Sequence, residues 1–98
     1  MTIRRLLRLK SGREDIGFYQ ARVLLEDGLK MGWCLQVVSP ADLDEFRRHL
    51  STGSSMSLSM VTRDGDYLRG EAAVSGLSES VDAATTVTLA GMGPLHAT

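Results

Sequence analysis

Residues that could hold a metal ion or attack a substrate are few and widely separated in this sequence. The two histidines, His49 and His96, lie far apart, and neither has a metal-site spacing with the single cysteine, Cys34. Cys34 follows Trp33 in a predicted strand, where no base can be assigned to activate its thiol. We interpret it as an inert, partly buried thiol, and we expect no metal, no cofactor and no enzymatic activity.

Acidic residues and glycines also have structural explanations. The carboxylates at positions 42–45 are typical of the first turns of a helix, where the helix dipole favours negative charge. Those at 64–66 flank a turn glycine. The Gly-Met-Gly segment at 91–93 is not followed by a helix, so it does not predict a phosphate-binding loop. These residues therefore indicate no small-molecule substrate.

Basic side chains are concentrated at the start of the chain, which makes this segment the one ambiguous feature. We consider four of them candidate partner-contacting residues: Arg4, Arg5, Arg8 and Lys10. They could contact nucleic acid or an acidic protein. Alternatively, they could be charges on an edge strand or arm that prevent aggregation. We favour the second interpretation, because no aromatic stacking residues occur around them.

Size and composition restrict the remaining possibilities. The chain has 98 residues, 43% of them hydrophobic, which fits a single β-rich domain over residues 1–98. A net charge of -1 does not favour nucleic acid or an anionic membrane as a general partner. We find no apolar run long enough to cross a bilayer or to act as a signal peptide, and one cysteine predicts no internal disulfide. We expect synthesis in a reduced cytosol.

The first half of the sequence predicts three strands. Residues 3–10 alternate weakly, with Ile3, Leu7 and Leu9 expected on one face, and 11–15 is a polar loop. Strands at 18–26 and 29–38 flank an Asp-Gly hairpin signal. A three-residue loop over 26–28 gathers the apolar rows on one face. It pairs Leu25 with Leu29, Val23 with Met31 and Ala21 with Trp33.

A helix over about residues 40–51 follows. Ser39 is the expected N-cap, Pro40 the first helical residue, and Gly53 the residue that ends the helix. Three apolar residues form its expected buried stripe: Leu43, Phe46 and Leu50.

The second half predicts another hairpin and a last strand. A three-residue loop over 63–65 joins strands that begin near 55 and 67. It pairs Met60 with Leu68, Leu58 with Gly70 and Met56 with Ala72. After a loop at 78–84, β-branched residues predict a strand over 85–90. The fold class is therefore mainly β: a small antiparallel β-sandwich or barrel with one short helix.

In the C-terminal quarter, a strand beginning Gly70-Glu71-Ala72 is followed by an acidic loop and then by a strand that ends in Gly-x-Gly-Pro-Leu at 91–95. This segment resembles the end of the major tail (tail tube) proteins of long-tailed bacteriophages. The segment at 33–37 resembles that family's Trp-bearing core strand, and Leu43 to Leu50 occupies the place of its single helix. The resemblance covers about residues 33–95 and leaves residues 1–30 unmatched.

This resemblance implies a structural protein without an active site. It implies a β-sandwich with a flanking helix that forms hexameric rings, which stack into a tube. The partners would be copies of the chain and other tail proteins, and DNA would only pass through the lumen. The protein would be made in the cytoplasm of a bacterial host and reside in the virion tail. A small β-barrel binding module that uses the basic N-terminal segment is the alternative.

Overall fold

The computed structural model describes residues 2–26, 32–79 and 84–97. Within these residues the protein is mainly β, as predicted, with eight strands and one short helix. The elements in chain order are β1 (Thr2–Ser11), β2 (Glu14–Asp15), β3 (Gln20–Leu25), β4 (Trp33–Val38), α1 (Leu43–Thr52), β5 (Ser55–Thr62), β6 (Tyr67–Ser78), β7 (Thr86–Gly91) and β8 (His96–Ala97). No helix in these ranges is both long enough and apolar enough to cross a membrane.

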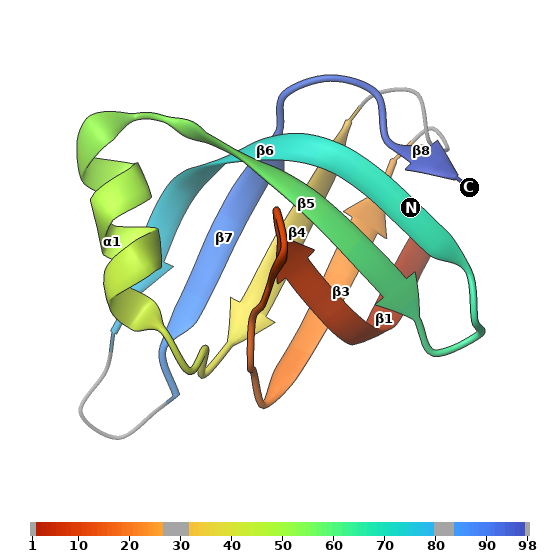
Figure 1. Ribbon diagram of the computed structural model, residues 1–98, viewed down its shortest axis with the longest axis horizontal. Coiled ribbons are helices and arrows are strands. Elements are labelled where there is room, and N and C mark those ends of the chain that lie inside the picture. Colours follow the sequence, from red (N-terminus) through yellow and green to blue (C-terminus); the bar gives the residue numbers. More distant parts are fainter. Residues whose placement is uncertain (1, 27–31, 80–83, 98) are drawn as a thin grey trace.

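The strands close into an antiparallel barrel (Figure 1). The hydrogen-bonded order around the barrel is β1-β3-β4-β7-β6-β5, and β1 also pairs with β5. Two short strands pair outside this order: β2 pairs with β1, and β8 pairs with β6. The choice between a sandwich and a barrel is therefore settled in favour of a closed barrel, which pairs the main strand edges.

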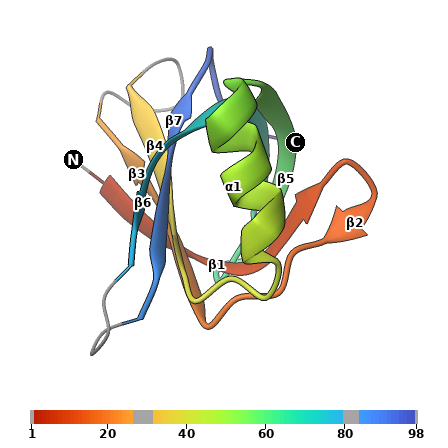
Figure 2. The ribbon, with the colours of Figure 1, turned by 90° about the vertical axis from the view of Figure 1, so that its left-hand side faces the viewer.

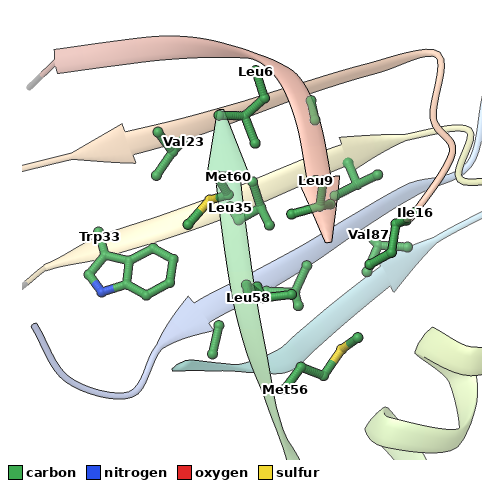
Figure 3. Close-up of a cluster of buried hydrophobic side chains, with 14 of the residues drawn as sticks. Leu6, Leu9, Ile16, Val23, Trp33, Leu35, Met56, Leu58, Met60 and Val87 are labelled. Carbon is green, nitrogen blue, oxygen red and sulfur yellow. The ribbon is translucent and has the colours of Figure 1, made fainter. Parts of the chain in front are cut away.

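The core fills the interior of this barrel. Side chains from opposite walls point toward one another there, among them Val23 from β3, Leu35 from β4 and Leu58 from β5 (Figure 3). The odd residues of β3 and β4 and the even residues of β5 are buried. This alternation places the remaining residues of those strands on the outer surface.

In β1, the residues that point inward differ on the two sides of a bulge. The prediction that Ile3, Leu7 and Leu9 share one face is therefore wrong. A bulge interrupts the pairing between Leu6 and Arg8. An extra residue shifts the alternation by one. Leu6 before the bulge and Leu9 after it are buried, whereas Ile3 and Leu7 are 54% and 62% exposed.

The second hairpin has the predicted register and the first does not. β5 and β6 pair Met60 with Leu68 around the expected loop. β3 and β4 instead pair Leu25 with Trp33 and Val23 with Leu35, because Glu26 bonds to Gly32 across a longer connection. Positions 27–31, which include the predicted partners Leu29 and Met31, lie outside the described residues. The shift is by an even number of residues, so the apolar rows still share one face.

α1 lies over one end of the barrel (Figure 2). It begins at Leu43 and its N-cap is Asp42, whose carboxylate accepts a hydrogen bond from the Glu45 amide. The predicted start at Ser39 and Pro40 is wrong because Ser39 has a positive φ and its amide donates a hydrogen bond to the carbonyl of Thr85, the residue before β7. Gly53 ends the helix in the left-handed conformation, as predicted. Of the expected stripe, only Phe46 is fully buried.

Candidate functional site

The basic N-terminal segment forms β1, but its four candidate residues do not lie together. Arg8 and Lys10 follow the bulge and pair with β5, whereas Arg4 and Arg5 precede it and pair with β3. β1 therefore pairs with β3 in its first half and with β5 in its second half. The interpretation of its charges as protection of a strand edge stays a prediction.

Arg4 is half-buried and forms its ion pairs within the molecule. Its guanidinium donates to Asp66 at 2.5 Å, to Asp64 at 3.4 Å and to the Thr62 hydroxyl at 3.3 Å. The hydrogen bond to Asp66 raises the pKa of Arg4, and burial opposes part of that increase. The Arg4 side chain is only 22% exposed. This residue joins β1 to the β5–β6 turn and offsets one of the two negative charges there.

Arg5 points outward where β1 pairs with β3. It lies opposite Arg22 of β3, and Arg22 donates through Nε to the Gln36 side chain at 2.8 Å. Two like charges directly opposite each other are unfavourable. The hydrogen bond to Gln36 directs the Arg22 guanidinium toward β4.

Arg8 and Lys10 join a second set of outward side chains that the sequence did not associate with them. Arg8 lies opposite Val61, which lies opposite Tyr67. Lys10 lies opposite Ser59, which in turn lies opposite Arg69. We call this surface of β1, β5 and β6 the cationic face, and its residues are Leu7, Arg8, Lys10, Val61, Tyr67 and Arg69.

The cationic face surrounds an open hollow. Its volume is about 820 Å³, and the charged side chains that line it are Arg8, Lys10 and Arg69. Tyr67 at its margin is 59% exposed. The expectation that no aromatic residue accompanies the basic segment is therefore wrong. β-sheet pairing brings Tyr67 next to the basic residues, although it is distant from them in the sequence.

A second outer surface is apolar. One row of cross-strand partners runs over five neighbouring strands: Ile3, Leu24, Cys34, Ala90 and Ala73. We call this row the apolar band. Ile3 and Ala90 are exposed, and the other three residues are half-buried. No local sequence pattern predicts this row, because it depends on the register of four strand pairs.

Cys34 lies at the centre of the apolar band. Burial raises the pKa of its thiol, the negative charge of Glu26 raises it further, and Arg22 lowers it. The protonated form is therefore favoured near neutral pH. This environment agrees with the interpretation of Cys34 as an unreactive thiol.

On the inner side of the same strands, several residues of the C-terminal segment pack around Trp33. Its indole donates through Nε1 to the Gly93 carbonyl at 2.8 Å. A Cβ atom at Gly91 would overlap the indole ring, and one at Gly70 would lie 2.9 Å from Trp33 Cζ2. Leu95 is buried beside this group, and its Cδ1 lies 3.0 Å from the same Gly70 position. The Trp33 side chain therefore requires glycine at positions 70 and 91, whereas a Cβ atom at Gly93 would meet nothing within 4 Å.

The remaining polar residues do not gather into a metal centre. His49 forms a hydrogen bond of 2.8 Å with Ser54 at the end of α1, and His96 lies in β8. Among residues 2–26, 32–79 and 84–97, no group of three or more histidine, cysteine or acidic side chains could hold a metal ion.

Comparison with known proteins gives no relative. No protein-family model, no curated protein and no solved structure matches this chain.

Proposed function

We propose that the protein is a structural, non-enzymatic subunit related to the tail tube proteins of long-tailed bacteriophages. The observation that carries this proposal is the arrangement around Trp33. The resemblance involves a Trp-bearing strand, the Gly70 strand and the Gly-x-Gly-Pro-Leu ending. In the fold, these three segments meet at the indole ring. The motif is therefore a set of positions that depend on one another.

The architecture also supports the proposal. A single helix lies between the Trp-bearing strand β4 and β5, which is the order that the resemblance implies. The helix flanks the β-structure, as implied, but this β-structure is a closed barrel and not the sandwich that the resemblance implies (Figure 1). The acidic loop of the motif falls largely at positions 80–83, outside the described residues.

The apolar band provides a surface for association. It crosses five strands on the outside of the barrel with no charged residue in the row. Burying such a surface against another molecule is favourable in proportion to its apolar area. We propose that the band contacts another copy of the chain. Repetition of this contact would form a ring, and rings would stack into a tube through which DNA passes.

Electron microscopy of the concentrated protein, together with light scattering, tests this proposal. We expect rings or tubes from the natural sequence. Ala90→Asp places a charge in the apolar band at an exposed position, so it should convert the assemblies to monomers without unfolding the barrel. Ala41→Asp, at an exposed alanine before α1, is the matched control and should assemble normally. A monomer at every concentration would contradict the proposal.

A further inference from the structure

The cationic face combines charge with an exposed aromatic ring. Arg8, Lys10 and Arg69 surround the hollow, and Tyr67 presents most of its surface to solvent beside them. Leu7 adds an exposed apolar side chain, and Val61 lies between Arg8 and Tyr67 in the central strand. A surface of this composition can contact both a charged backbone and a flat apolar ring.

The charges of this face are not used within the fold. In the described part of the chain, the ion pairs are those of Arg4 and Arg47 with acidic residues, and none involves Arg8, Lys10 or Arg69. Unpaired cations gathered around one hollow create a positive potential that attracts anions.

Arg4 makes this potential stronger. Asp64 and Asp66 lie in the turn next to Tyr67, where free carboxylates would repel an anionic ligand. The Arg4 guanidinium contacts both of them from the inner side of β1. Its single positive charge offsets one of the two negative charges, so the three cations of the face, Arg8, Lys10 and Arg69, outnumber the one negative charge that remains in the turn. Two acidic residues adjoin the face: Asp15 of β2 lies opposite Lys10, and Glu71 lies opposite Ser57 in the next row. Among the described residues, neither forms an ion pair with Arg8, Lys10 or Arg69.

We propose that the cationic face binds single-stranded nucleic acid. Phosphates would contact Arg8, Lys10 and Arg69, and one base would stack on Tyr67. Single strands suit this surface because their bases are free to stack on an aromatic side chain, whereas the bases of a duplex are not. An acidic peptide would satisfy the cations but would leave Tyr67 without a stacking partner. This inference does not depend on the assembly proposal, because the face and the apolar band share no residue.

Fluorescence anisotropy with a labelled oligothymidylate tests the inference. A strand of about 16 nucleotides covers the upper site size of a small β-barrel module. We expect binding that weakens with salt, with a slope of log K against log salt of about -2 for three neutralised phosphates. Tyr67→Ala should weaken binding by roughly 5- to 150-fold, which is the effect of losing one stacked base. Tyr67→Phe keeps the ring and should bind like the natural protein.

Charge substitutions complete the test. Arg69→Ala should reduce the salt slope by about 0.7, because one phosphate contact is lost. Arg48→Ala removes an exposed charge from α1, away from the face, and should leave both affinity and slope unchanged. Circular dichroism would check that each variant is folded.

Three outcomes would overturn the inference. The first is absence of oligothymidylate binding at low salt. The second is equal binding of a duplex of the same length with no effect of Tyr67→Ala, which would indicate attraction by charge alone. The third is tighter binding of polyglutamate than of the oligonucleotide, which would indicate an acidic protein partner.

Discussion

The apolar band and the cationic face lie on the outside of the same barrel, but the structures beneath them differ. The band is backed by the packing of Trp33 against Gly91 and Gly70. The cationic face is backed by the buried side chains of Met60 and Leu68. At its border, ion pairs of Arg4 hold the β5–β6 turn. Close packing tolerates little change in volume, whereas an exposed ion pair is adjustable and sensitive to salt.

β1 connects these two surfaces and explains how one strand serves both. Before the bulge its outward residue Ile3 belongs to the apolar band, and after the bulge Arg8 and Lys10 belong to the cationic face. The bulge therefore changes both the inward residues and the chemical character of the outer surface. A closed barrel has paired its main strand edges, so its outward side chains determine what it binds.

The largest expected effect is on the free energy of unfolding, when the packing around Trp33 beneath the apolar band is disturbed. Gly91→Ala forces the Trp33 indole to move, and overpacking of this kind costs about 3 kcal/mol in the free energy of unfolding. Gly76→Ala is the matched control, because a Cβ atom there meets nothing within 4 Å. Urea denaturation measures both variants. Equal stabilities would show that the indole does not require a glycine at this place.

A smaller effect is expected at the border of the cationic face. Arg4→Gln removes the ion pairs with Asp64 and Asp66, which should lower the free energy of unfolding by at most about 1 kcal/mol, since the acidic partners are exposed. The loss should shrink as salt is added, because salt screens the ion pairs of the natural protein. Urea denaturation at low and high salt tests this. A loss that is the same at both salt concentrations would argue for packing instead.

The smallest effect concerns the reactivity of Cys34. Burial and Glu26 raise the pKa of this thiol, so alkylation by iodoacetamide at neutral pH should be slower than in the unfolded chain. Glu26→Gln removes the negative charge, lowers the pKa and should modestly accelerate alkylation. The rate rises with pH in both proteins, since the thiolate is the reactive form. No difference between folded and unfolded protein would contradict the described environment of Cys34.

The sequence predicts local features of this fold better than distant ones. The β5–β6 hairpin was predicted in its correct register because its three-residue loop fixes the pairing. For β3 and β4, the apolar alternation determined only which residues share a face, and the longer connection shifted the pairs. The start of α1 was misplaced because Ser39 bonds to Thr85, a contact between distant segments.

The cationic face could not be predicted, because it forms from the pairing of segments that lie still further apart in the sequence. Arg8 and Lys10 lie on the outer surface, and their neighbours come from the pairing of β1 with β5, which no local pattern indicates. The bulge in β1 further separates Arg4 and Arg5 from them. Tyr67 could be linked to Arg8 only after both strand pairs were known.

The central claim is that the apolar band and the cationic face act separately, the first in assembly and the second in binding single-stranded nucleic acid. Sedimentation velocity with a fluorescent oligothymidylate measures both properties in one experiment. We predict that Ala90→Asp sediments as a monomer that still carries the oligonucleotide, and that Tyr67→Ala forms assemblies that no longer carry it. A folded variant that loses both properties through one of these substitutions, or a natural protein that shows neither, would contradict the account.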